Sequence, residues 1–397
     1  MDAIVEKAAS IQENLVNHRR TLHQMPELDL SLPRTRAYVT EQLRALGLEP
    51  VAVGEGGLSV TIGRGEIDRT VLLRADMDAL PIIEETAVPF KARGDAMHAC
   101  GHDLHTAMLL GAAGLLMEMA GDIPGTVKLM FQPGEETLRG ARDMIENGIL
   151  EGVDAAMMIH VFTGVPAPSG LFILPEAGPT TAASDWFEIL IQGKGGHGAM
   201  PENTVDPLNI AAHTHISLQG LNSREIAATD PAVITIGRMA GGSTSNVIPD
   251  TALLQGTVRT FDETTRDFIE ERITAIARGV ATSFRGEAEV TYRRGCPSVV
   301  TDSDTLEILR DALSRHFDDT SLLDFSSLSK GGKLMGSEDF SFVTKAVPSV
   351  MLGLTAGNSE EGYAFPHHHP KTVFDESCLY LGTAAYVGFA LEWMSRQ

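Results

Sequence analysis

The sequence predicts one α/β domain that is interrupted by a smaller inserted α+β domain. Length is the first observation, because 397 residues correspond to two or three domains at roughly 150 residues each. The second is that helix and strand patterns alternate in the first and last parts of the chain. The third is a middle part whose elements follow the order βαββαβ. We place the α/β domain at 1–183 and 295–397 and the inserted domain at 184–294.

The elements of the first part follow from the spacing of its apolar residues. Pro33 opens a helical pattern for which Gly47 is a stop signal. Short apolar runs predict buried strands at 71–73, 127–131 and 155–161. A long helix is expected at about 104–119, with Asp103 as its N-cap. This alternation is typical of a largely parallel sheet.

The middle part changes to a different pattern, and the last part returns to the first one. The predicted elements of the middle part are strand 186–191, helix 207–221, strands 232–238 and 252–261, helix 266–284 and strand 288–293. This order indicates a ferredoxin-like unit. The last part is predicted to hold helix 306–317, strand 349–354 and helix 376–394.

Composition excludes several classes of protein. The hydrophobic fraction of 43% and charged fraction of 21% are those of an ordinary globular chain. A formal net charge of −22 repels phosphate backbones and anionic membranes, so we expect neither nucleic acid nor a membrane as partner. Three cysteines are too few for a disulfide framework. With no signal-peptide pattern and no run of about 18 apolar residues, a cytoplasmic protein is expected.

The segment MHACGHDLHTAM is the densest cluster of side chains that can bind a metal. Cys100 and His102 are two residues apart, so in extended backbone they share a side and can converge on one ion. His98, Asp103 and His105 lie in the same segment. The structural alternative is a capped helix start with a buried thiol.

Two glutamates, Glu135 and Glu136, directly follow the predicted strand 127–131. Open α/β sheets build their sites at strand ends, where one carboxylate can bind metal while its neighbour acts as a base. The alternative is a pair of surface glutamates, although the strand that they follow reads as buried.

Histidines provide the remaining candidates. His160 closes the apolar run 155–161, and His367, His368 and His369 form a run near the C-terminus. Taken alone, the first could be a satisfied core histidine and the others a solvated loop. Together the four segments offer thiolate, carboxylate and imidazole at strand ends and in loops, so they predict one metal site.

Seven motifs follow one another between His18 and Asp375: HRRTLHQMPELDL, LRADMDALP, MHACGHDLHTAMLLGAA, FQPGEE, GKGGHGAMP, GGSTSNVIPD and GSEDFSF. They resemble the metal-dependent amidohydrolase family of hippurate hydrolase, N-acyl-L-amino-acid amidohydrolases and plant auxin-conjugate hydrolases. The resemblance implies a zinc-peptidase-like α/β/α catalytic domain with an inserted dimerisation or lid domain. It also implies metal-dependent hydrolysis of N-acyl-amino acids, such as hippurate or N-acetyl-amino acids, to a carboxylic acid and a free amino acid.

The resemblance further implies two divalent metal ions per chain. The implied ligands are Cys100 as the bridge, with His102, Glu136, His160 and His368. His368 is chosen because family members have a histidine two residues before the position of Pro370, and His367 and His369 stay open as alternatives. A thiolate and imidazoles favour zinc, while manganese, cobalt or nickel also suit such a site.

Catalytic and substrate-binding roles come from the same resemblance. Glu135 matches the family's general base, and His197 matches a histidine that reaches the partner subunit's site and binds the developing oxyanion. Asn246 resembles a residue that holds the end of the substrate. Arg259 is our candidate for the substrate's α-carboxylate, or else a strand residue in a surface ion pair. A histidine that acts in trans predicts a homodimer, or a dimer of dimers, through the inserted domain and its edge strands.

One motif departs from the wider dinuclear group. Carboxypeptidase branches have H-x-D-x-V-P where this chain has DMDALP, so Asp76 stands in place of a ligand histidine and Cys100 must bridge. Asp76 and Asp78 are therefore expected to support the ligands or to cap nearby backbone, with direct ligation by Asp78 left open. Asp103 and Glu338 are further expected supports.

Three other functions remain open at this point. A metallo-carboxypeptidase or dipeptidase on the same fold differs only in the acyl side of its substrate. A cysteine hydrolase would use Cys100 as nucleophile and would survive a chelator. A non-catalytic metal-dependent binding protein would have no need of Glu135 beside Glu136.

Overall fold

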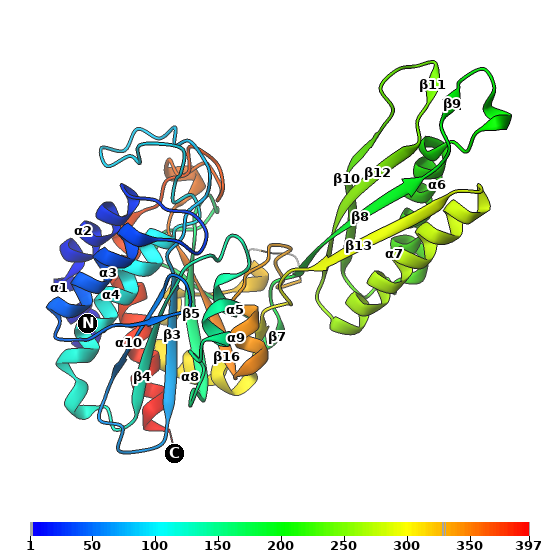
Figure 1. Ribbon diagram of the computed structural model, residues 1–397. Coiled ribbons are helices and arrows are strands. Elements are labelled where there is room, and N and C mark those ends of the chain that lie inside the picture. Colours follow the sequence, from blue (N-terminus) through cyan, green and yellow to red (C-terminus); the bar gives the residue numbers. More distant parts are fainter. Residues whose placement is uncertain (1–2, 328, 330, 397) are drawn as a thin grey trace. The chain divides into compact units, whose positions relative to one another are not determined.

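The chain folds into two units, each with its own core, in a computed structural model that describes residues 3–327, 329 and 331–396 (Figure 1). Unit 1 consists of the described residues up to Thr180, from Val299 to Lys333 and from Glu338 onward, and unit 2 of Thr181–Ser298 with Leu334–Ser337. The predicted boundaries at 183/184 and 294/295 lie a few residues away, and the predicted ends 1 and 397 fall outside the described residues. The prediction assigns 334–337 to the first unit, whereas in the structure Ala182 donates its N–H to the carbonyls of Leu334 and Gly336.

Unit 1 is built on an eight-stranded sheet with the strand order β1-β2-β4-β3-β5-β16-β6-β15. Its strands are β1 (Val51–Val53), β2 (Gly57–Ile62), β3 (Thr70–Asp76), β4 (Thr126–Gln132), β5 (Ala155–Phe162), β6 (Phe172–Leu174), β15 (Leu322–Asp324) and β16 (Ser349–Thr355). The four central strands β4, β3, β5 and β16 are parallel, so their carboxyl ends lie at one edge of the sheet. A short antiparallel pair consists of β7 (Gly178–Pro179) and β14 (Val300–Thr301). It lies next to the two points at which the chain passes from unit 1 into unit 2 and back.

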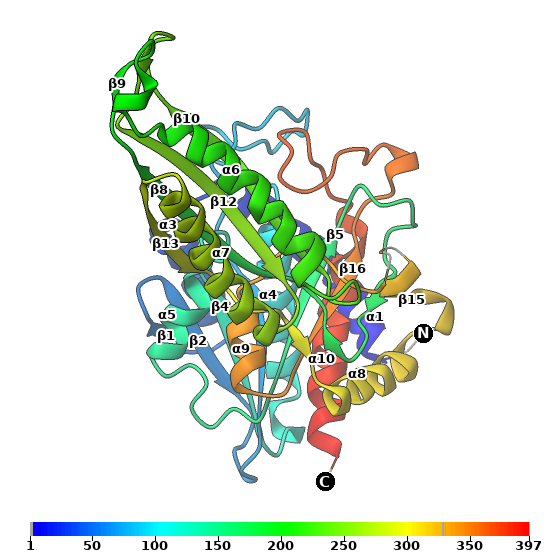
Figure 2. The ribbon, with the colours of Figure 1, turned by 90° about the vertical axis from the view of Figure 1, so that its right-hand side faces the viewer.

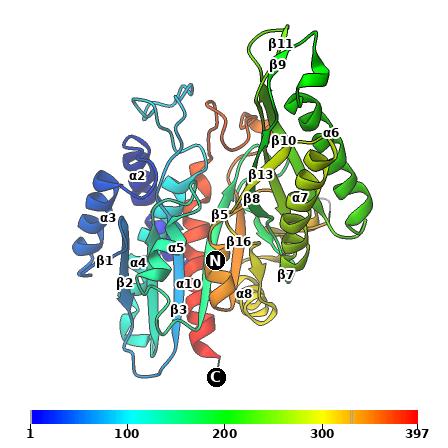
Figure 3. The same cartoon turned by 45° about the vertical axis from the view of Figure 1, so that its right-hand side comes forward.

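Helices cover both faces of this sheet (Figure 3). They are α1 (Ala3–Ser10), α2 (Gln12–His23), α3 (Pro33–Ala45), α4 (His102–Glu118), α5 (Gly140–Glu146), α8 (Ser303–His316), α9 (Ser341–Ala346) and α10 (Leu379–Ser395). The central helices α4 and α10 pack on one face with α1, α2, α3 and α8 around them, while α5 and α9 cover the other. Among the described helices, none is both long and apolar enough to span a bilayer.

The elements that the sequence predicts for unit 1 are found, and several others are not predicted. Strands β1, β2, β6 and β15 are absent from the prediction, and the last predicted helix begins with a 3-10 turn at Glu376–Cys378. The predicted N-cap is wrong. Helix α4 begins at His102, and Gly101 before it has a left-handed φ of 93°. Glycine is required there also because a Cβ would come within 2.4 Å of the Val161 side chain. Asp103 lies inside the first turn with its carboxylate bound elsewhere.

Unit 2 has the predicted βαββαβ order. Its elements are β8 (Ala183–Gln192), α6 (Pro207–Gly220), β10 (Ala232–Gly241), β12 (Thr251–Thr260), α7 (Glu263–Ser283) and β13 (Glu287–Arg294), and a π-helical turn (Leu221–Glu225) extends α6. The antiparallel sheet has the order β10-β12-β8-β13, which leaves β10 and β13 as edge strands. Helices α6 and α7 lie side by side on one face of it (Figure 2). A small ribbon of β9 (Gly196–His197) and β11 (Val247–Ile248) completes the unit.

Candidate metal centre

Side chains that can bind a metal gather at the carboxyl edge of the parallel strands in unit 1. They are Asp76 and Asp78 at the end of β3, Cys100 and His102 at the start of α4, Glu135 and Glu136 after β4, His160 near the end of β5, and His368 in the loop between β16 and α10. Parallel strands place their carboxyl ends together, so segments far apart in the sequence converge here. The structure therefore brings together the four segments that the sequence predicts as one site.

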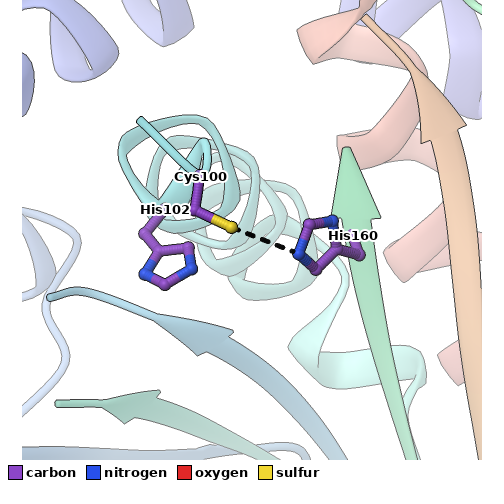
Figure 4. A group of neighbouring side chains, drawn as sticks. All are labelled: Cys100, His102 and His160. Atoms are coloured by element: carbon purple, nitrogen blue, oxygen red, sulfur yellow. Dashed lines mark hydrogen bonds between the residues drawn. The ribbon is translucent and has the colours of Figure 1, made fainter. Parts of the chain in front are cut away.

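The Cys100 thiol lies between the rings of His102 and His160 (Figure 4). Its Sγ is 3.7 Å from Nε2 of His160, and the ligand atoms of all three residues lie within 4.8 Å of one another. A second group within the same limit consists of Cys100, Glu136 and His368. Because the thiol belongs to both groups, it would be available to a metal held by either one.

Backbone carbonyls fix the tautomers of two histidines. Nδ1 of His102 lies 2.8 Å from the Asp78 carbonyl oxygen, and Nδ1 of His160 lies 2.7 Å from that of Val161. A carbonyl only accepts, so each Nδ1 carries the proton and donates it. The lone pair of each Nε2 is left for a metal, which is the usual arrangement around a ligand histidine.

His105 has a different role from these two histidines. Its Nδ1 donates to Oδ1 of Asp76 at 2.6 Å, and its Nε2 accepts from the N–H of Val161 at 2.9 Å. Both ring nitrogens are therefore occupied by protein. Burial opposes ionisation of Asp76, but His102, Arg74 and His105 outweigh it and hold the pKa of Asp76 well below its usual range.

Asp78 positions the two glutamates. Its Oδ1 accepts the backbone N–H of Glu135 at 3.0 Å and its Oδ2 that of Glu136 at 3.1 Å. Its own carbonyl holds His102, as described above. Both carboxylate oxygens are thus used to support the backbone, which favours the expected supporting role over direct ligation.

A fully buried arginine beneath the site is absent from the sequence prediction. Arg74 donates to Oδ2 of Asp76 at 2.8 Å, to Glu338 and Asp339 at 3.0 Å each, and to Oε1 of Gln132 at 2.9 Å. Glu338 and Asp339 form a group with Glu135 in which carboxylate oxygens lie within 4.8 Å of one another. A charged residue within the apolar run of β3 was the available signal, because arginine is almost never fully buried unless it is paired.

Asp103 fixes the start of α4 through buried hydrogen bonds. Its Oδ2 accepts from Nε of Arg19 at 2.9 Å and from Nδ1 of His23 at 2.8 Å. Nε2 of His23 lies 3.2 Å from Oε2 of Glu84, which also accepts the N–H of Ala92. Neighbouring His98 is buried, and its burial lowers its pKa to about 4. Asp103 therefore supports the ligand-bearing helix through buried hydrogen bonds rather than as a cap.

The three consecutive histidines face in different directions. Nε2 of His368 lies 3.4 Å from Oε1 of Glu136, whereas the ring of His367 packs 5.4 Å from that of His160. His369 stacks on Phe365 with ring centroids 4.4 Å apart. Of the three, only His368 belongs to a metal-competent group of the described residues.

Glu135 lies next to these groups with its carboxylate almost fully buried. Its Oε2 is 3.9 Å from Nε2 of His102, and it forms a group with His102 and Glu136. Burial, followed by the charges of Glu338 and Glu136, raises the pKa of Glu135 well above its usual range. A carboxylate with raised proton affinity is suited to act as a general base.

The donor set fits divalent cations. Nε2 of His102 is buried and has no hydrogen-bond partner in the described structure. The site also attracts positive charge: hydrogen bonds to Cys100 and Glu136 raise the pKa of His368 to about 10. Buried lone pairs that converge in a field of carboxylates are the features of a metal site.

The substrate-binding candidates lie in unit 2. His197 in β9 pairs with Val247 in β11, and Gly198 donates its N–H to the carbonyl of Asn246 at 2.9 Å. His197 and Asn246 are thus neighbours, and both are exposed. Arg259 lies near the opposite end of β12, paired with Ser184, and donates to the carbonyl of Val258. The structure therefore does not bring Arg259 to the other two, and Arg259 makes no ion pair among the described residues.

Comparisons with known proteins agree with this geometry. A family model described as peptidase family M20/M25/M40 matches residues 72–392. The chain is 35% identical to thermostable carboxypeptidase 1 of Saccharolobus solfataricus, over 97% of both chains. It is also 35% identical to an N-acetyl-L-cysteine deacetylase of Bacillus subtilis, over 94% of this chain and 86% of that protein. A solved Bacillus subtilis structure described as a dinuclear metal binding peptidase from the M20 family shares 31% identity, with a TM-score of 0.84 and coverage of 98% and 99%.

Proposed function

The chain belongs to peptidase family M20/M25/M40, and on that premise we propose that it hydrolyses the amide bond of N-acyl-amino acids. Cys100, His102, Glu136, His160 and His368 are the proposed ligands of two divalent ions. The observation that supports hydrolysis over simple metal storage is Glu135, a buried carboxylate held beside ligand Glu136 by the same Asp78 side chain.

The residues divide the work between them. When bound, divalent ions lower the pKa of a water molecule and polarise the amide carbonyl. Glu135 takes the proton of that water and later gives it to the departing amine, for which its raised pKa suits it. Asp78 holds the backbone of the glutamate turn, and Arg74 bonds Gln132 at the end of the strand before it. Burial of the cluster strengthens each of these interactions.

Unit 2 supplies the rest of the proposed site from a second copy of the chain. His197 would donate to the oxyanion that forms at the amide carbon, and the neighbouring Asn246 would hold the end of the substrate. Both side chains are exposed on unit 2, and its edge strands β10 and β13 are open to pairing. We therefore propose a homodimer formed through unit 2, in which each active site is completed by the partner.

Isosteric substitution of the two glutamates tests the chemistry. For Glu135→Gln we expect kcat to fall roughly 100- to 10,000-fold, with bound metal unchanged by elemental analysis. Glu136→Gln is the matched variant on the adjacent residue, and it should lose metal as well as activity. Loss of metal from Glu135→Gln with metal retained in Glu136→Gln would show that the two roles are exchanged.

Mixing and dilution experiments test whether each active site needs a second copy of the chain. Mixing an inactive His197→Ala chain with an inactive Glu135→Gln chain should restore activity, because one of the two mixed sites is then complete. Recovery should follow the dimer concentration measured by ultracentrifugation. Full wild-type activity in a sample diluted to monomer would refute action in trans.

A carboxypeptidase or dipeptidase activity is the second candidate, favoured by the identity with thermostable carboxypeptidase 1. The two functions differ in whether the group acylating the amino acid carries an amine. Amine release from a panel of N-acyl-amino acids and dipeptides, with added metal or with chelator, separates them. Chelator-sensitive release from N-acyl compounds alone is the result that we expect.

A further inference from the structure

Pairing between the two central strands of unit 1 stops before the strands end. β3 and β5 pair in parallel only as far as Arg74 and Met158. On their other sides, β3 continues to pair with β4 as far as Asp76, and β5 continues to pair with β16 as far as Phe162. Among the described pairs, the last residues of β3 and β5 are therefore not joined to each other. We call this opening the β3–β5 split.

A buried tyrosine lies at the inner end of the β3–β5 split. Tyr386 belongs to α10, far along the chain, and is 0% exposed. Its hydroxyl donates to the carbonyl of Arg74 at 2.7 Å and accepts the N–H of Ile159 at 3.0 Å. Buried tyrosine hydroxyls need such partners. Here one oxygen bonds a backbone group of each strand at the point where their pairing ends.

Two side chains of α4 occupy the rest of the split. Nε2 of His105 accepts the N–H of Val161, and the hydroxyl of Thr106 donates to the carbonyl of Asp76 at 2.8 Å. Nδ1 of His105 also bonds the carboxylate of Asp76. Backbone groups beyond the last pair are thus bonded to side chains, so the split stays open with these groups satisfied.

The split separates two supports of the candidate metal centre. His160 is part of β5, whereas His102 is held by the carbonyl of Asp78 just after β3. Both rings flank the Cys100 thiol (Figure 4), and the ligand atoms of the three residues lie within 4.8 Å of one another. The spacing of His102 and His160 therefore depends on how the ends of β3 and β5 are held.

We propose that Tyr386 is a positioning residue of this centre, and that its hydroxyl sets the spacing of His102 and His160 by fixing the inner end of the split. The hydroxyl bonds backbone rather than either ring, so it acts through the two strands. Groups that orient metal ligands in this way typically change metal affinity about 10- to 100-fold when they are removed. This inference rests on the proposed metal-dependent function.

Loss of this one hydroxyl tests the role. After removal of metal with chelator, Tyr386→Phe should bind zinc about 10- to 100-fold more weakly than the wild type in equilibrium dialysis. Thr383→Val is the matched control on α10, because it also removes a buried hydroxyl, one that donates to the carbonyl of Met108 on α4. Its zinc affinity should stay within about 3-fold of that of the wild type. Both metal-free variants should melt at a lower temperature, because each loses a buried hydrogen bond.

Cobalt gives a second readout, which a general loss of stability would not change. In the cobalt-loaded protein, the absorption band from the Cys100 thiolate should shift in Tyr386→Phe and stay in place in Thr383→Val. Thr106→Val removes the bond to the carbonyl of Asp76 at the outer end of the split. It should also weaken zinc binding, and it provides the test if Tyr386→Phe does not fold.

The outcomes for Tyr386 and for hydrolysis are separate. Unchanged zinc affinity in Tyr386→Phe, or an equal loss in Tyr386→Phe and Thr383→Val, would overturn the positioning role. If Tyr386→Phe does not fold, unchanged affinity in Thr106→Val would overturn it. A wild type that cleaves no N-acyl-amino acid would refute the proposed function, whereas a loss of zinc affinity in Tyr386→Phe but not in Thr383→Val would still support the role of Tyr386.

Discussion

Arg74 in unit 1 and Arg266 in unit 2 are both buried against carboxylates, but the balance of charge around them differs. In unit 1, Arg74 is 0% exposed and bonds three carboxylates, those of Asp76, Glu338 and Asp339. In unit 2, Arg266 forms a two-pronged pair with one buried carboxylate, Asp185, at 2.6 and 2.8 Å. Its other carboxylate partner, Glu263, is half-exposed.

The two networks also differ in what they join. Asp185 also accepts from the hydroxyl of Tyr292 and from the N–H of Gly295, and Arg266 reaches the carbonyl of Cys296. This balanced network joins the two chain segments at which unit 2 begins and ends. Around Arg74 the carboxylates outnumber the guanidinium, an arrangement that is unfavourable without further cations. Burial raises the pKa of Glu338 and of Asp339 in spite of Arg74, so unit 1 keeps an excess of buried carboxyl groups where the proposed metals bind.

Removing Arg74 should give the largest effect. For Arg74→Met we expect a loss of about 5 kcal/mol in the free energy of unfolding, because three carboxylates would lose their buried cation. Urea denaturation with hydrogen exchange should place the loss in unit 1. Arg139→Met, which removes an exposed pair with Asp29, is the control and should cost less than about 1 kcal/mol. If Arg74→Met lowered the free energy of unfolding as little as the Arg139→Met control, the three carboxylates would already be neutralised without Arg74.

Removing Arg266 should cost less and act elsewhere. Arg266→Met should lower the free energy of unfolding by about 3 kcal/mol, because Asp185 keeps its bonds to Tyr292 and Gly295. Hydrogen exchange should accelerate in unit 2 while metal content stays unchanged. Arg272→Met is the matched control on the same helix, since its pair with Glu225 is partly exposed. Loss of metal from Arg266→Met would contradict the separation of the two networks.

Metal binding should stabilise unit 1 alone. With free ion at 100 times its dissociation constant, linkage gives about 2.7 kcal/mol of added stability per site. Protein stripped with chelator and then titrated with zinc or manganese should show slower hydrogen exchange around α4 and β5, with unit 2 unchanged. His102→Ala should abolish the gain. Equal protection of both units would refute a metal site confined to unit 1.

The long elements of both units could be predicted because their apolar spacing is local to the sequence. The strand order of unit 2 follows from its βαββαβ pattern, whereas β1, β6 and β15 have three residues each and depend on their neighbours in the sheet. The cap of α4 was mispredicted because a close approach to Val161, which lies far along the chain, requires glycine at position 101.

The candidate site shows the same limit. That thiol, carboxylate and imidazole residues meet at one edge could be predicted, since they follow strands of a largely parallel sheet. Spacing alone could not show which of three consecutive histidines faces Glu136, because the answer depends on the positive φ of His368; the family resemblance pointed to His368. The partners of Arg74 at 338 and 339 are likewise set by tertiary packing. The separation of Arg259 from His197 follows from strand register, which a motif does not report.

The smallest expected effect that separates the two units is a change in the pH dependence of stability caused by a histidine. In α2, half-buried His18 bonds the hydroxyl of Tyr38 at 2.8 Å, and burial lowers the pKa of His18 below its usual value near 6.5. The unfolded chain therefore takes up a proton at a higher pH than the folded chain, so this contribution to stability is complete above about pH 6.5 and is lost on acidification. His18→Gln should flatten the fall in unit 1 stability below pH 6.5, as followed by hydrogen exchange, while His213→Gln in unit 2 should leave that slope unchanged. An unaltered slope in His18→Gln would show that the acid sensitivity of unit 1 arises at other groups.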